Sequence, residues 1–246
     1  MAIISLHNLD YEIDGQVILK DINLEFKEGE TFVIMGPSGC GKSTLLRLIM
    51  GLAQPTAGWI EIDGAITSHL SKNDWRLLRR KMGMVFQSSA LFDSMTVFDN
   101  VAFGLRRAKT SESLIEKRVY EVLSIVGLDR SVAQKMPADL SGGMKKRTAI
   151  ARAIAFEPPI LLYDEPTTGL DPIIADTIND LIGELQDRLG ITSIVVTHDI
   201  TSALKIADRV GLLYETNLVE VRERADLKNT EHPLMKEFLK NFQLAI

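Results

Sequence analysis

The chain has 246 residues and a mass of 27.3 kDa, a length that fits one large domain or two small ones. Hydrophobic residues make up 46% of it and charged residues 25%, which is ordinary for a globular protein and excludes a mainly disordered chain. The 28 basic residues are outnumbered by 33 acidic ones, so the net charge of −5 gives no indication of a nucleic-acid partner.

The first third of the chain has the pattern of short strands joined by tight turns. Asp14-Gly15 and Asp63-Gly64 are hairpin signals, and the residues around them are rich in strand formers. Between the hairpins, residues 31–35 predict a strand, which a glycine-rich turn connects to a helix. The apolar residues expected on one face of that helix are Leu45, Leu48, Ile49 and Leu52, and Gly51 lies near its end.

The rest of the chain predicts helices first and then an alternation of strands and helices. Residues 89–157 are mostly helical in pattern. Further on, residues 160–163, 194–196 and 210–213 read as buried strands, and Pro172 opens an amphipathic helix. This alternation predicts an α/β fold with a mostly parallel sheet, an antiparallel β subdomain and a helical insertion.

The turn after the strand at 31–35 has the spacing of a phosphate-binding loop: glycine, four residues, glycine, lysine and serine or threonine. Its residues are Gly36, Pro37, Ser38, Gly39, Cys40, Gly41, Lys42, Ser43 and Thr44. Glycines let backbone amides approach phosphate oxygens, and the helix that follows adds its dipole. We expect Lys42 to contact the β- and γ-phosphates of a nucleotide and the Ser43 hydroxyl to ligate Mg²⁺. A flexible glycine turn is the competing interpretation, and the strand–loop–helix context disfavours it.

Two carboxylates and a histidine follow buried strands. Asp164 and Glu165 come directly after residues 160–163, and His198 comes after the strand at 194–196. Charged groups at the carboxyl ends of parallel strands fall where open α/β sheets bind ligands. With a phosphate loop upstream, we expect Asp164 to hold Mg²⁺, Glu165 to accept a proton from an attacking water and His198 to contact the γ-phosphate. A solvated turn, or for His198 a packing role, is the alternative.

A second loop suited to an anion precedes another helix. Leu140-Ser141-Gly142-Gly143-Met144 leads into a run with Lys145, Lys146, Arg147 and Arg152, and Ser-Gly-Gly at a helix N-terminus can accept an anion or simply cap the helix. One bound nucleotide needs only one such loop, so the pair requires another explanation.

Taken together, these motifs resemble the ATPase subunit of an ATP-binding cassette (ABC) transporter, a P-loop NTPase with a RecA-like core. In chain order the matches are Tyr11 as an aromatic residue on adenine, Gly36–Thr44 as Walker A, Gln87 as the Q-loop glutamine, Leu140–Met144 as the signature, Ile160–Asp164 as Walker B, Glu165 as catalytic base, Gly169–Asp171 as the D-loop and His198 as the switch histidine. The resemblance implies ATP and Mg²⁺ as cofactors, with Ser43, Gln87 and Asp164 at the metal. Tyr11 fits simple strand packing equally well.

The same resemblance implies how the second loop is used and what the chain binds. In this family ATP lies between Walker A of one copy and the signature of the other, so Ser141, Gly142 and Gly143 would act in trans and Asp171 would lie at the dimer interface. The second copy, and a membrane permease to which Gln87 couples, are the implied partners. Part of residues 88–100 would form the permease groove, or else belong to the helical core.

A finer resemblance concerns the kind of transporter. Met144-Lys145-Lys146-Arg147, with residues 89–94 and 167–172, is similar to the Mla/Mce-associated ATPases, which power phospholipid transport between the membranes of diderm bacteria. That group implies an MlaE-type permease, an MCE-domain periplasmic protein and a STAS-domain subunit. An importer of amino acids or another small solute is the alternative.

The sequence features also suggest a location and a division of the chain. Residues 48–60, the longest stretch without Asp, Glu, Lys or Arg, cannot cross a bilayer, the N-terminus has no secretory signal, and the lone Cys40 fits a reducing compartment. Cys40 itself is either a small filler or a redox switch. We expect a soluble ATPase held peripherally at the cytoplasmic side of the inner membrane.

We divide the single ABC domain into residues 1–88 (β subdomain and Walker A), 89–157 (helical subdomain), 158–214 (rest of the core) and 215–246 (hairpin and helix). The helix from Pro233, with Leu234, Phe238 and Phe242 one turn apart, could pack on its own core, on the second copy or on a partner. Two other classes compete with the transporter assignment. A P-loop kinase would need no second anion loop, and a soluble ABC ATPase of repair or translation would carry a second cassette or a coiled-coil insertion.

Overall fold

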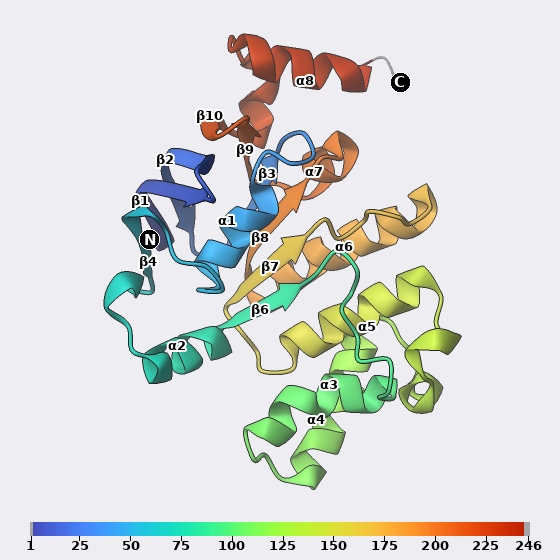
Figure 1. Cartoon of the computed structure of the whole chain (residues 1–246). Helices are drawn as coiled ribbons and strands as arrows, with labels where there is room; N and C mark the ends of the chain where they lie inside the picture. The colour runs from blue at the N-terminus through green and yellow to red at the C-terminus, as the bar shows by residue number, and fades with distance from the viewer. Residues whose placement is uncertain (1, 244–246) are drawn as a thin grey trace.

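A computed structural model of the chain describes residues 2–243, and the side chains of residues 2–240. It contains a four-stranded and a six-stranded sheet with eight α-helices around them in this part of the chain (Figure 1). The smaller sheet has the order β2-β1-β4-β5 and is antiparallel. Its strands are β1 (Ala2–Ile13), β2 (Gln16–Lys27), β4 (Ala57–Ile62) and β5 (Ala65–Ile66).

Both predicted hairpin turns are confirmed. Asp14 and Gly15, between β1 and β2, have φ values of 51° and 79°, and Asp63 and Gly64, between β4 and β5, have values of 49° and 75°. Positive φ at both central residues is what the two-residue turn between twisted antiparallel strands requires. Each Asp-Gly turn thereby joins an edge strand of the β subdomain, β2 or β5, to its neighbour in the sheet.

The larger sheet is the core of the molecule. Its order is β10-β9-β3-β8-β7-β6, and every pair in it is parallel except β10 with β9. The strands are β3 (Thr31–Met35), β6 (Met82–Val85), β7 (Ile160–Asp164), β8 (Thr192–Thr197), β9 (Arg209–Tyr214) and β10 (Asn217–Glu223). The parallel sheet predicted from the strand–helix alternation is therefore present.

The register of the parallel strands brings four loops to one edge of the sheet. Met35 pairs with Thr197, Asp164 pairs with Val196, and Val85 pairs with Tyr163. The residues that follow these strand ends are Gly36, Gln87, Glu165 and His198, so segments far apart in sequence meet at the carboxyl edge. This is the edge where open α/β sheets place their ligands.

Helices cover the core sheet and build a separate lobe. Figure 1 shows α3, α4 and α5 grouped below the sheet and α8 at the opposite end of the molecule. The α-helices are α1 (Lys42–Ile49), α2 (Lys72–Leu78), α3 (Val97–Arg107), α4 (Glu112–Ile125), α5 (Gly142–Ile154), α6 (Pro172–Leu189), α7 (Ile200–Ile206) and α8 (Pro233–Gln243). Short 3₁₀ turns occupy Thr67–His69, Arg79–Lys81, Arg130–Gln134, Pro137–Asp139 and Arg224–Asn229.

Two apolar cores lie on the two faces of the central sheet. Along β3, Phe32 and Ile34 point into the core shared with the β subdomain, whereas Val33 and Met35 point into the core shared with the helical lobe. All four side chains are fully buried, as expected for a parallel strand covered on both faces. The phosphate loop leaves the end of this strand, so it starts from an element that is buried on both faces of the sheet.

The C-terminal helix α8 packs on its own chain. Met235 is fully buried, and Leu234, Phe238 and Leu239 are partly buried against the larger apolar core, which here includes Ala203 and Ile206 of α7. The helix contacts α7. Of the three positions outlined for this helix, packing on its own core is therefore the observed one, while Phe242 lies outside the described side chains. Within residues 2–243, no helix combines the length and apolar character needed to span a membrane.

Candidate functional site

The loop after β3 has a shape that depends on its glycines. A Cβ on Gly36 would lie 2.1 Å from the carbonyl oxygen of Leu213 and 2.8 Å from Sγ of Cys40. Gly41 has φ of 101°, and a Cβ there would lie 2.9 Å from Cδ2 of Leu19. The loop is thus packed against β9 and β2 so tightly that only glycine fits at these two positions, and helix α1 starts directly after it.

Lys42 is held inside this loop. Its Nζ atom donates to the carbonyl oxygens of Gly36 at 2.8 Å and Pro37 at 2.9 Å, and lies 3.8 Å from Oε1 of Glu165. Only 5% of the side chain is exposed, so the ammonium group is a desolvated point charge over the N-terminus of α1. Both features favour a bound phosphate at this position.

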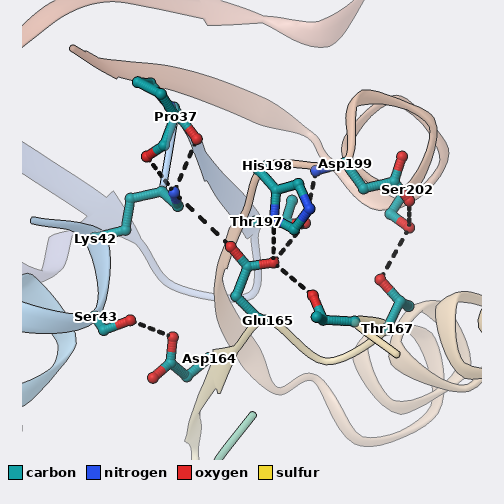
Figure 2. Close-up of polar contacts among 12 residues, drawn as sticks. Pro37, Lys42, Ser43, Asp164, Glu165, Thr167, Thr197, His198, Asp199 and Ser202 are labelled. Atoms are coloured by element: carbon teal, nitrogen blue, oxygen red, sulfur yellow. Dashed lines mark hydrogen bonds and ion pairs between the residues drawn. The ribbon is translucent and has the colours of Figure 1, made fainter. Parts of the chain in front are cut away.

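Ser43 and Asp164 form the pair expected of an Mg²⁺ site. The Ser43 hydroxyl donates to Oδ1 of Asp164 at 2.6 Å, which joins the start of α1 to the end of β7 (Figure 2). A hydroxyl and a carboxylate are oxygen ligands of the kind Mg²⁺ prefers, so these two residues fit the ion. Ser43 and Gln87 line one cavity, and Asp164 lies behind Ser43 without lining it. When bound there, Mg²⁺ would neutralise charge on the β- and γ-phosphate oxygens.

Glu165 lies at the centre of a hydrogen-bond cluster. Its Oε2 atom accepts from the Thr168 hydroxyl at 2.9 Å, lies 3.4 Å from Oγ1 of Thr197 and lies 2.9 Å from Nδ1 of His198 (Figure 2). Its backbone has φ of 48°, a strained value for a residue other than glycine. The backbone amide is fixed by the carbonyl of Val196 at 3.0 Å. The carboxylate is therefore aimed by its surroundings, as a catalytic base must be.

A cavity of about 410 Å³ brings together most of the predicted site. Its walls are Ile18, Ser38, Gly39, Gly41, Lys42, Ser43, Thr44, Gln87, Glu165 and His198. Tyr11 is not among them. Its ring packs on the core of the β subdomain, and Ile18 of β2 supplies the hairpin's contact with the cavity. Burial raises the pKa of the Cys40 thiol, so the loop cysteine is held as a neutral thiol.

The polar cluster around Glu165 continues away from the cavity. Asp199 donates its backbone amide to the Thr197 hydroxyl at 3.0 Å and accepts from the Ser202 hydroxyl at 2.6 Å. Ser202 in turn lies 3.4 Å from the hydroxyl of Thr167 (Figure 2). It also accepts from Nδ2 of Asn179 at 2.9 Å. The loop after β7 and the loop that carries His198 are thereby joined by side chains on both sides of Glu165.

The signature residues do not reach the cavity of their own chain. Ser141 caps helix α5, because its hydroxyl accepts from the amide of Met144 at 3.3 Å. A Cβ on Gly143 would lie 2.6 Å from Cγ2 of Ile174, so this loop packs against the start of α6. Asp171 caps α6 by accepting from the amide of Ile174 at 3.0 Å. Neither Asp171 nor residues 141–143 line the cavity, among the residues that the structure describes.

Some contacts were not anticipated from the sequence. Thr168 has a signal in the sequence, since it lies three residues after Glu165 in a turn. Lys146 and Arg152, by contrast, read only as the basic side of α5. In the fold they reach the segment that contains Gln87, about sixty residues earlier in the chain.

The assembled groups suit the hydrolysis of a nucleoside triphosphate. The cavity offers a cation and free helix N–H groups for phosphates, an oxygen-ligand pair for Mg²⁺ and a fixed carboxylate that can accept a proton from water. In-line attack on a γ-phosphate needs positioning and electrostatic stabilisation more than covalent chemistry.

Comparison with known proteins agrees with this chemistry. The family described as ABC transporter matches residues 19–168. The chain is 42% identical over 239 residues to the intermembrane phospholipid transport system ATP-binding protein MlaF of Haemophilus influenzae, covering 97% of this chain and 90% of that protein. It is 44% identical over 240 residues to the methionine import ATP-binding protein MetN of Carboxydothermus hydrogenoformans, covering 96% of this chain and 71% of that protein.

Solved structures give the same assignment. The dimeric structure of MJ0796, a bacterial ABC transporter cassette, matches with a TM-score of 0.82 and 38% identity over 90% of this chain and 98% of that chain. The same cassette has been solved as a dimer in a post-hydrolysis state bound to ADP and Pi. The predicted α/β P-loop NTPase fold is confirmed. The chain belongs to the ABC transporter family, as an ATP-hydrolysing subunit.

Proposed function

We propose that two copies of the chain close over two ATP molecules, with the signature loop of each completing the site of the other. The observation that carries this proposal is the position of the signature: Ser141, Gly142 and Gly143 are absent from the cavity that holds Lys42 and Glu165. A helix N-terminus suited to an anion is therefore directed elsewhere. The dimeric form of the MJ0796 cassette supports the arrangement.

Within each site the residues have separate roles. Lys42 and the loop amides bind the β- and γ-phosphates, and Ser43, Asp164 and Gln87 serve Mg²⁺. Glu165 receives a proton from the attacking water, and its hydrogen bond to His198 fixes the imidazole where the γ-phosphate ends. Because closure depends on the γ-phosphate, its removal would let the two copies separate.

We further propose that the permease docks in a groove on the helical lobe. Met95, Asp99, Phe103, Arg106 and Arg107 line a hollow of about 550 Å³ on α3. Phe92, 40% exposed, packs against Phe103 with 4.6 Å between ring centroids and a tilt of 42° between the rings. Met95 and Phe103 give the hollow apolar walls, and Arg107 adds a positive charge beside the ion pair of Arg106 with Asp99. These features fit an amphipathic helix that carries a carboxylate. Gln87 and the groove belong to one continuous segment, which gives the permease a route to the nucleotide.

Charge reversal at the rim tests the docking site. Arg107→Glu places a carboxylate on an exposed position of the groove, and we expect it to reduce co-purification of the permease while the melting temperature stays unchanged. Lys117→Glu, on the exposed face of α4, is the matched control. Wild-type recovery of the permease with Arg107→Glu would place the docking site elsewhere.

For the transported substrate we propose phospholipid, moved between the inner and outer membranes. The support is the similarity to MlaF and the run Met144-Lys145-Lys146-Arg147 after the signature glycines. The complex would then contain an MlaE-type permease, an MCE-domain periplasmic protein and a STAS-domain subunit, with this chain at the cytoplasmic side of the inner membrane. Import of methionine or another small solute is the second candidate, favoured by the 44% identity to MetN.

Isolation of the intact complex separates the two substrates. The full assembly is purified from membranes in mild detergent through a tag on this chain, and its lipids are identified by mass spectrometry. A phospholipid held by the permease, together with ATPase stimulation by phospholipid, is the expected result. Stimulation by a solute-binding protein loaded with an amino acid would contradict it and establish the importer.

A further inference from the structure

Two cations of α5, the buried Lys146 and the half-buried Arg152, hold the segment that contains Gln87. Nζ of Lys146 donates to the carbonyl oxygens of Phe86 at 3.2 Å and Gln87 at 2.8 Å. Lys146 is only 2% exposed, so these carbonyls replace water around its ammonium group. The contact fixes the backbone of the glutamine whose side chain faces the ATP cavity.

Arg152, nearly two turns further along α5, holds the next part of the same segment. Its Nη1 atom donates to the carbonyl of Ala90 at 2.6 Å, and Nη2 donates to the carbonyl of Ser89 at 2.9 Å. Ser89 and Ala90 have φ values of 64° and 45°. Two consecutive residues other than glycine in the left-handed region cost free energy, and they persist only where neighbouring groups hold them. We call Lys146 and Arg152 together the α5 clamp.

The clamp is not an ordinary helix-capping arrangement. Arg118 of α4 shows the ordinary case, since it donates to the carbonyls of Ile154 and Ala155 at the end of α5, where a helix leaves its carbonyls unpaired. The clamp instead donates to four carbonyls of an irregular segment. Burial lowers the pKa of Lys146 to about 8, opposed by the nearby carboxylates of Asp164 and Glu165, and it also lowers the pKa of Arg152. Removing a cation from water costs free energy that a neutral side chain packed in the same place would not cost.

The clamp joins two parts of the molecule that serve different ATP molecules. Helix α5 begins at the signature, which we assign to the site of the second copy, whereas Gln87 lines the cavity of its own chain. We propose that Lys146, supported by Arg152, is a positioning residue for Gln87, and that it transmits the orientation of the signature helix to the Q-loop of the same chain. This proposal rests on the roles given above to Gln87 and the signature.

Steady-state ATPase kinetics of the full-length chain test the proposal. Lys146→Met keeps the length and apolar stem of the side chain but removes its donors, so Gln87 loses its backbone anchor. We expect kcat to fall about tenfold or more with little change in KM for ATP, because Walker A is untouched. Lys146→Arg restores donors and charge, and should recover most of kcat. Lys117→Met, on the exposed face of α4, should match the wild type.

A double-mutant cycle shows whether Lys146 acts through Gln87. In a Gln87→Ala background there is no side chain left to position, so Lys146→Met should change kcat less than twofold, although each single variant is slow. Independent, multiplicative losses would mean that Lys146 only supports the fold, and would overturn the proposal. A wild-type kcat for either single variant would overturn it as well. Since the assay contains neither permease nor lipid, it does not depend on the transported substrate.

Discussion

Gly36 shows how closely the phosphate loop is fitted to the sheet beneath it. A Cβ added to Gly36 would lie 2.1 Å from the carbonyl oxygen of Leu213. This oxygen belongs to the backbone, so it cannot move aside as the end of a flexible side chain can. Gly36→Ala must therefore displace the loop or β9. We expect a loss of about 1–3 kcal/mol in the free energy of unfolding, measured by urea denaturation, together with weaker ATP binding.

The control for this substitution is another glycine of the same chain. Gly183 lies within α6, and a Cβ there would meet no atom within 4 Å. Gly183→Ala should leave the protein as stable as the wild type or stabilise it by about 1 kcal/mol, because alanine favours the helix. Equal stabilities for the Gly36 and Gly183 variants would contradict the tight fit described for the loop.

Glu165 combines a strained backbone with a carboxylate held through its Oε2 atom. Its φ of 48° and its contacts with Thr168 and His198 hold the carboxylate beside Lys42. The strain is compensated by the paired sheet on either side, since Asp164 is the last residue of β7 and the Glu165 amide bonds to β8. A rigid edge can hold a catalytic group in a conformation that a free loop would leave.

At the scale of single elements, the start of α3 is stabilised by a charge network. Asp99 accepts from Nη1 of Arg106 at 2.7 Å and from the Thr96 hydroxyl at 2.7 Å, and Thr96 caps the helix. The hydrogen bond from Arg106, followed by that from Thr96, lowers the pKa of Asp99 below its ordinary value of 3.8. Because the folded-state pKa is the lower one, the carboxylate stabilises the fold above pH 3.8.

This contribution is lost as the pH falls through the lowered folded-state pKa. We expect the wild type to be more stable than Asp99→Asn at pH 7, and the difference between the two proteins to shrink progressively below pH 4. Urea denaturation of both proteins across this pH range measures it. A stability difference that stays constant down to pH 2 would show that the Asp99 charge does not stabilise α3.

The elements also show what the sequence could predict. Asp-Gly turns, the strand at Thr31–Met35 and the helix from Pro172 depend on local patterns, and the structure contains all of them. Strand β6 (Met82–Val85) and helix α2 (Lys72–Leu78) were not anticipated. Four residues containing Gly83 have no readable period, and a Cβ on Gly83 would meet Ala153 of a helix seventy residues away. Such a residue is set by packing that no local pattern encodes.

The candidate site likewise contains residues that local sequence patterns predict and residues that they do not. Walker A, the Asp164-Glu165 pair and His198 follow from residue type and from parallel strands that end at one edge. Tyr11 differs, because it is partly buried against the core of the β subdomain and does not line the cavity, and its contact with adenine stays a prediction. Lys146 likewise reads as one basic residue of a helix until the fold brings it to Gln87.

At the scale of the whole molecule, the proposed function gives each chain half of two ATP sites. Lys42 and Glu165 lie in one cavity, whereas Ser141 lies at the start of α5, outside it. Under this proposal a complete site requires a second copy, and its closure requires a triphosphate. The proposed permease groove on α3 lies in the same helical lobe as the signature, which would link docking to both ATP sites.

The most direct test of this central claim is the mass of Glu165→Gln in solution with ATP and Mg²⁺, measured by light scattering during gel filtration. Loss of the catalytic base should lower hydrolysis at least about 100-fold without removing ATP binding. The account predicts a particle of twice 27.3 kDa with ATP and a single chain with ADP. Adding Ser141→Arg to the same protein should return it to a single chain. A Glu165→Gln protein that binds ATP yet remains a single chain, or one that still hydrolyses ATP at the wild-type rate, would contradict the account.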